Sequence, residues 1–69
     1  MKTNKVSVFK LRDGGGFEQL FVYKDPAVAK RDAMRREGID AEVYELVVTA
    51  DAVGIIRVFN ADVSERLVD

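Results

Sequence analysis

The carboxylate and hydroxyl side chains are the groups in this sequence that could carry acid–base, metal-binding or nucleophilic chemistry. The chain has no histidine and no cysteine, so no imidazole can activate a hydroxyl and no thiolate can attack or bind a metal. Among the twelve carboxylates, the candidates are Asp25, Asp32, Asp40, Glu42, Glu45, Asp51, Asp62 and Glu65, and the hydroxyls are Thr3, Ser7, Tyr23, Tyr44, Thr49 and Ser64. No carboxylates follow the spacing of a calcium-binding loop. We therefore expect no catalytic, cofactor or metal site and no enzyme.

The glycine run Gly14-Gly15-Gly16 is a possible phosphate-binding loop. Such a loop needs a following Lys-Ser/Thr pair and a helix whose N-terminus meets the phosphate. Here Phe17-Glu18 opens a segment with strand character instead. The run therefore predicts a tight turn between two strands.

A group of basic side chains lies between positions 24 and 36 and could contact phosphates or an acidic protein surface. Its members are Lys24, Lys30, Arg31, Arg35 and Arg36. Residues four positions apart share a helix face, so Arg31 and Arg35 would form part of one basic ridge. Asp32 and Glu37 interrupt this ridge, and an ordinary solvated helix face is the competing interpretation.

The composition indicates one small domain over residues 1–69. Apolar residues make up 48%, and 11 basic residues balance 12 acidic ones to give a net charge of −1. This balance lacks the basic excess typical of nucleic-acid binders. A chain this short buries a marginal core, so its stability must come from economical packing or from a partner that covers exposed surface. No apolar run has the length of a signal peptide or membrane span, which favours a cytoplasmic protein.

The N-terminal part predicts a β-hairpin. Lys5–Arg12 and Phe17–Lys24 are rich in aromatic and β-branched residues that alternate with polar ones, as strands do. The glycines between them supply the backbone freedom that a reversal needs.

Asp25-Pro26 predicts the start of a helix that ends at Gly38. Aspartate can cap free amides, proline loses no needed donor in the first turn, and glycine is favoured just past a helix end. Ala29 and Ala33 share one face, so we expect a buried stripe of small residues.

Ile39–Val48 alternates again and predicts a third strand. A strand–helix–strand passage favours a crossover that leaves its two strands parallel. With the hairpin formed first, the predicted spatial order is 2-1-3, with Lys5–Arg12 in the middle. We expect a mixed, mostly antiparallel sheet with the alanine-rich helix on one face.

The C-terminal segment has two interpretations. Thr49 resembles a helix start, and an apolar stripe that continues to about Asn60 favours a C-terminal helix, which gives a ββαβα, α+β fold. The β-branched residues would also suit a fourth strand at 53–59. The tail Ala61–Asp69 is expected to add a short turn capped by Asp62, or to fray.

The predicted strands carry apolar side chains on both faces. Phe9 and Leu11 alternate with Val6 and Val8, and the strand around Tyr44 behaves in the same way. One helix covers one face only, so either the C-terminal segment or another chain must cover the second face.

The segments YKDPAVAKRDAMRREGIDAEVYELVVT and TADAVGIIRVFNAD resemble small accessory proteins encoded by bacteriophages and prophages, and the resemblance covers about Phe21–Asn60. The resemblance implies a β-sheet domain with helices and an accessory role in infection. It brings no catalytic residues.

These observations lead to a hypothesis of a non-enzymatic protein-binding module, a phage-encoded modulator or inhibitor of a host protein in the bacterial cytoplasm. The predicted partner-binding residues are Phe21, Tyr23, Lys30, Arg31, Arg35, Arg36 and Tyr44. One alternative is a nucleic-acid-associated regulator that uses the basic ridge, and another is a homodimeric structural accessory protein.

Overall fold

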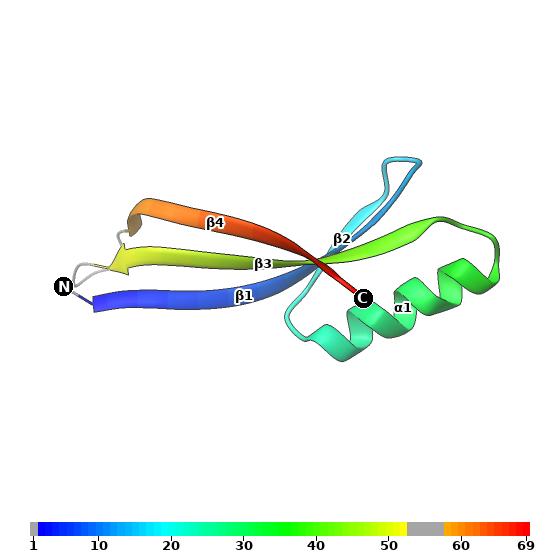
Figure 1. Ribbon diagram of the computed structural model, residues 1–69, viewed down its shortest axis with the longest axis horizontal. Coiled ribbons are helices and arrows are strands. Elements are labelled where there is room, and N and C mark those ends of the chain that lie inside the picture. The colour runs from blue at the N-terminus through cyan, green and yellow to red at the C-terminus, as the bar shows by residue number, and fades with distance from the viewer. Residues whose placement is uncertain (1, 53–57) are drawn as a thin grey trace.

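The chain forms an antiparallel β-sheet with a helix on one of its faces (Figure 1). The computed structural model describes residues 2–52 and 58–69, with side chains over 5–49 and 63–69. The elements are β1 (Lys2–Asp13), β2 (Glu18–Phe21), α1 (Lys24–Arg36), β3 (Ala41–Ala52) and β4 (Val58–Val68). The prediction of an α+β protein is confirmed.

The strand order in the sheet is β2-β1-β3-β4. β1 pairs antiparallel with both β2 and β3, so these two outer strands run parallel to each other on either side of it. The predicted order 2-1-3 with β1 in the middle is therefore confirmed. The prediction of a mixed sheet is wrong, because β3 and β4 are also antiparallel and no described neighbours are parallel.

The β1–β2 hairpin is closed by the glycine turn and by the side chain of Asp13. Its Oδ1 atom accepts hydrogen bonds from the amides of Gly15, at 2.9 Å, and Phe17, at 2.8 Å. Gly16 has a φ of 97°, a conformation that costs glycine nothing. The structure thus confirms the predicted turn, although β2 ends at Phe21, earlier than expected.

The predicted start of the helix, with Asp25 as the cap and Pro26 as the first helical residue, is wrong by two residues. α1 begins at Lys24, and Tyr23 is its N-cap in an extended conformation with no side-chain hydrogen bond to the helix. Asp25 lies in the first turn, where a negative charge complements the helix dipole without capping it.

The predicted helix end at Gly38 is confirmed. Gly38 has a φ of 81°. Its amide donates to the Arg35 carbonyl, and the Ile39 amide donates to the Met34 carbonyl, both at 3.0 Å. This pair of bonds is a Schellman motif, which satisfies the last carbonyls of the helix and turns the chain toward β3.

The predicted buried stripe of α1 is wrong. Ala29 and Ala33 are exposed, and Ala27 and Arg31 face the sheet. In the described part of the chain, the fully buried apolar side chains are Leu11, Ala27, Ala41 and Val43, with Phe9, Phe21, Met34 and Val68 packed around them. The core therefore lies between α1 and one end of the sheet.

The predicted C-terminal helix is wrong. The alternative prediction of a fourth strand is correct, although the strand extends beyond the predicted 53–59. β4 covers Val58–Val68, so the tail neither forms a turn capped by Asp62 nor frays. Residues 53–57 lie outside the described residues. The ladder between β3 and β4 shifts register between Thr49 and Asp51. Pairing along β3 gives residues 58–68 the backbone partners that decide between strand and helix.

The sheet extends well beyond the helix (Figure 1). α1 and β2 lie at one end, which we call the helix end. At the other end, residues 2–8 of β1, 46–52 of β3 and 58–65 of β4 continue as a ribbon of three strands that we call the arm. The longest dimension of the molecule is 47 Å.

Candidate functional site

The face of the sheet opposite α1, which we call the open face, carries a band of apolar side chains. The register places its members in rows across β1, β3 and β4: Val6, Val48 and Val63; Val8 and Leu46; and Tyr44 and Leu67, with Leu20 of β2 at the edge. Val6 is 57% exposed, Val63 62% and Leu20 64%. Because β4 joins the sheet, the described C-terminal residues do not cover this face, as a C-terminal helix would have done.

Charged side chains interrupt the apolar band of the open face: Lys10, Arg12 and Glu42 lie toward the helix end, and Glu65 lies in the row of Val8 and Leu46. Arg12 donates to Glu65 at 3.2 Å. Its guanidinium also lies over the Tyr44 ring, 4.6 Å from the ring centroid, which is a cation–π geometry. The positive charge of Arg12 is thus balanced within the chain.

The open face carries apolar residues at both ends of the sheet, whereas the side that faces α1 is apolar mainly at the helix end. At the helix end the buried residues Leu11 and Val43 point toward α1. In the arm that side carries mainly polar residues, such as Ser7 and Ser64, and the apolar residues Val6 and Val48 occupy the open face instead. Alternation of this kind is typical of a strand with one buried face. The open face of the arm therefore has the pattern of a surface that is covered.

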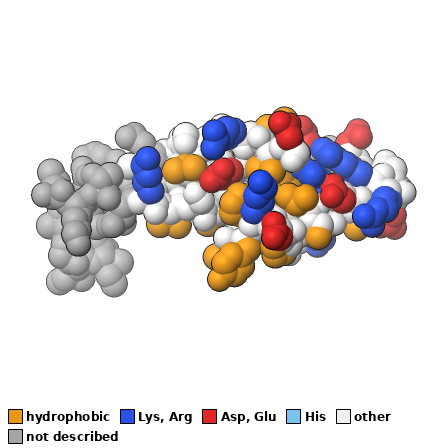
Figure 2. Space-filling view, turned by 60° about the horizontal axis from the view of Figure 1, so that its bottom comes forward, with side chains coloured by type: hydrophobic (Ala, Val, Ile, Leu, Met, Phe, Trp, Pro, Cys, Tyr) orange, Lys and Arg blue, Asp and Glu red, His pale blue; other side chains and the backbone are white. Residues whose placement is uncertain are grey.

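The predicted basic ridge does not form a continuous positive surface. The ammonium group of Lys30 donates to Gln19 Oε1 and lies 5.0 Å from the Phe17 ring centroid. Figure 2 shows basic and acidic side chains interspersed on the face it presents. Lys30 is thus engaged with the hairpin, and Arg36 is exposed at the end of α1.

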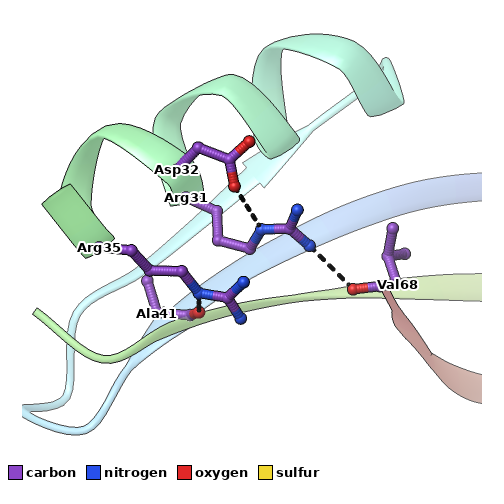
Figure 3. A network of polar contacts seen from close by, with 5 residues as sticks. All are labelled: Arg31, Asp32, Arg35, Ala41 and Val68. Carbon is purple, nitrogen blue, oxygen red and sulfur yellow. Dashed lines mark hydrogen bonds and ion pairs between the residues drawn. The ribbon is translucent and has the colours of Figure 1, made fainter.

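Arg31 and Arg35 hold α1 to the sheet (Figure 3). Arg31 is 5% exposed, donates to the Val68 carbonyl at 2.9 Å and pairs with Asp32 Oδ1 at 3.1 Å. Arg35 Nε donates to the Ala41 carbonyl at 2.9 Å. The prediction that Arg31 contacts a partner does not fit this burial, because its guanidinium already donates a hydrogen bond to the Val68 carbonyl at the end of β4. Sequence reasoning missed this role, although Ala27, Arg31 and Met34 have helical spacing.

The predicted aromatic contact residues do not form one site. Tyr44 lies on the open face, and Phe21 packs against the core beneath α1. Tyr23 is 73% exposed and precedes the helix. The predicted contact residues include Tyr44 but not Val6, Leu46, Val48 and Val63, which lie on the same face. The alternation of Val6, Leu46 and Val48 along their strands indicated that face, whereas Val63 was assigned to a helical stripe.

The described residues hold no pocket and no group of three or more side chains that could bind a metal ion. Within the same residues, no helix combines the length and apolar character that a membrane span requires. No family model matches the chain, and neither does any curated protein or solved structure.

Proposed function

We propose that this chain is a non-enzymatic protein-binding module and that the open face is its binding surface. The observation that carries the proposal is the apolar band on the side of the sheet that α1 does not cover. At the helix end α1 covers the apolar side, whereas in the arm the apolar residues Val6, Val8, Leu46 and Val48 lie on the side away from α1.

The energetics of apolar burial support a protein partner. Covering a fully exposed valine or leucine stabilises a complex by about 1.5–3 kcal/mol, and partly exposed side chains contribute in proportion to the area they lose. Val63 at 62%, Leu20 at 64% and Leu67 at 47% retain much of that area. Tyr44 adds an aromatic ring of the kind enriched at protein interfaces.

The chemistry of the face favours a protein over a nucleic acid. Nucleic-acid binding depends on a concentration of unpaired basic groups, whereas Arg12 on the open face is paired with Glu65, and Arg31 of the basic ridge is buried. The partner in this proposal presents an apolar surface. The resemblance to phage accessory proteins makes a bacterial host protein one candidate, and a second copy of this chain is the other.

Site-specific photo-cross-linking in bacterial cells tests the proposal. A benzophenone amino acid is placed at Val6 or, as the matched control, at Ser7, its neighbour on β1 that faces the other side of the sheet. Both side chains are exposed. We expect protein adducts from position 6 at more than ten times the yield from position 7.

Mass spectrometry of the adducts then identifies the protein, whether it is foreign or a copy of this chain. Equal yields from the two positions, or no adduct from position 6, would refute the open face as a binding surface. Leu46→Asp should abolish the position 6 adduct, since it places an unpaired charge within the same apolar band.

A further inference from the structure

We infer that the protein seated on the open face is a second copy of this chain, packed face to face to form a two-sheet sandwich with a helix on each outer side. This inference rests on the proposed function and specifies its partner. Three features of the molecule lead to it: the size of its core, the arrangement of charge on the open face, and the area of that face.

The core of a single copy is small. The fully buried apolar side chains among the described residues are Leu11, Ala27, Ala41 and Val43, and two of these are alanines. Small domains usually supplement such a core with disulfides, metal ions or association. The sequence has no cysteine and no histidine, which removes disulfides and zinc sites held by these residues. A cover that supports folding must be present whenever the chain is, and a second copy meets this condition.

The charges on the open face suit a self-complementary contact. Arg12 is neutralised within its own chain by Glu65 and by the Tyr44 ring. The face carries Lys10 and Arg12 against Glu42 and Glu65, so no single sign of charge dominates that would select an oppositely charged partner. It offers an apolar centre, and an isologous interface requires such a surface to match itself.

The position of the charges also indicates where the two-fold axis passes. Lys10 and Arg12 lie toward the helix end, whereas the rows through Val6 and Val8 lie in the arm. An axis perpendicular to the strands at these apolar rows brings Val6, Val8, Leu46 and Val48 of the copies together. It also keeps each Lys10 and Arg12 away from its symmetry mate. Glu65, which shares the row of Val8 and Leu46, stays paired with Arg12 of its own copy.

The dimensions of the face fit a dimer interface. β1 has 12 residues, and three strands of that length at ordinary strand spacing give a flat footprint of roughly 570 Å². Side chains raise the accessible area above the flat one, and a standard interface buries about 800 Å² per partner. Packed sheets in sandwiches lie about 10 Å apart with their side chains interdigitated.

Sedimentation equilibrium of the full chain tests the inference. We expect the wild type to sediment as a dimer at micromolar concentration. Leu46→Asp should raise the dissociation constant about a hundredfold, because it buries an unpaired charge at the interface. Ser7→Asp is the matched control, since it adds the same charge to the other side of the arm, and it should leave the dimer intact. Circular dichroism and denaturant unfolding establish that each variant is folded.

Cross-linking locates the interface independently of these variants. The chain has no cysteine, so a single one can be introduced at Leu46 or at Ser7 and treated with a bismaleimide that spans about 10 Å, the spacing of packed sheets. We expect covalent dimers from Leu46→Cys and monomers from Ser7→Cys.

Two results would overturn the inference in distinguishable ways. A wild type that stays monomeric while position 6 captures a foreign protein in cells would refute the second copy and leave the proposed function standing. A dimer that survives Leu46→Asp, or that is linked through Ser7→Cys, would place self-association on another surface. A folded monomer with no adduct at position 6 would refute both.

Discussion

The helix end and the arm share strands β1, β3 and β4, but they differ in whether the apolar side chains of these strands are covered. At the helix end, Leu11 and Val43 are fully buried beneath α1, and Arg31 and Arg35 fasten the helix to the last residues of β4 and the first of β3. In the arm the apolar residues lie on the open face, and α1 does not extend over this part of the sheet.

This difference shows that the strand pattern alone does not identify the core of a single copy. Val6 has the sequence character of a core residue and is 57% exposed, whereas Arg31 has the character of a surface residue and is 5% exposed. In our account Val6 contributes to an interface, and Arg31 attaches the helix to the sheet.

Leu11→Ala should cause the largest loss of stability. The side chain is fully buried at the helix end, and removing such a side chain costs about 2–5 kcal/mol of unfolding free energy. Denaturant unfolding measures the change. Val6→Ala in the arm should cost under about 1 kcal/mol in dilute solution, and more at concentrations where the open face is covered. Equal losses for the two variants at high dilution would contradict the division into a core end and an interface end.

Arg31→Met should lower the unfolding free energy by about 2 kcal/mol, because it keeps the aliphatic stem but leaves the Val68 carbonyl without its charged donor. Arg36→Met is the matched control on the exposed end of the same helix and should change stability by less than about 0.5 kcal/mol. Thermal unfolding by circular dichroism distinguishes them. If the two variants lose the same stability, Arg31 does not fasten α1 to β4.

Gly38→Ala should cost about 1 kcal/mol. Gly38 has a φ of 81°, which strains any residue with a Cβ atom, although space around it is open. Gly14→Ala provides the comparison, since Gly14 also has open space and does not have a positive φ. It should leave the unfolding free energy unchanged or slightly raised. A neutral Gly38→Ala would show that the Schellman turn is not needed to direct the chain into β3.

The Arg12–Glu65 pair should show the smallest effect, a coupling energy below about 1 kcal/mol. Its side chains are 39% and 45% exposed, so solvent screens the attraction. A double-mutant cycle with Arg12→Ala and Glu65→Ala in dilute solution measures the coupling, and added salt should reduce it. A coupling that salt does not affect would indicate that the pair is shielded from solvent.

The parts of the fold that the sequence predicted correctly depend on local chemistry. The glycine turn and the helix end at Gly38 follow from backbone conformations that glycine adopts without strain. The order 2-1-3 follows from the hairpin and from the crossover that α1 makes.

The parts that could not be predicted depend on distant contacts. β4 forms because β3 offers a ladder to pair with, and a β-branched segment read alone is compatible with either a helix or a strand. Arg31 is buried because the end of the β3–β4 ladder brings the Val68 carbonyl within reach of α1. The second apolar face was visible in the alternation, but the extent of the sheet beyond α1 was not.

The reactivity of a single cysteine at Val6, compared with one at Ser7, tests most directly whether the open face of the arm is an interface. Both native side chains are exposed in one copy, so the two thiols should react with a maleimide at similar rates at high dilution. At micromolar concentration we predict that Val6→Cys reacts at least tenfold more slowly, while Ser7→Cys keeps its rate. Equal rates for the two positions at every concentration and in bacterial lysate would contradict the account.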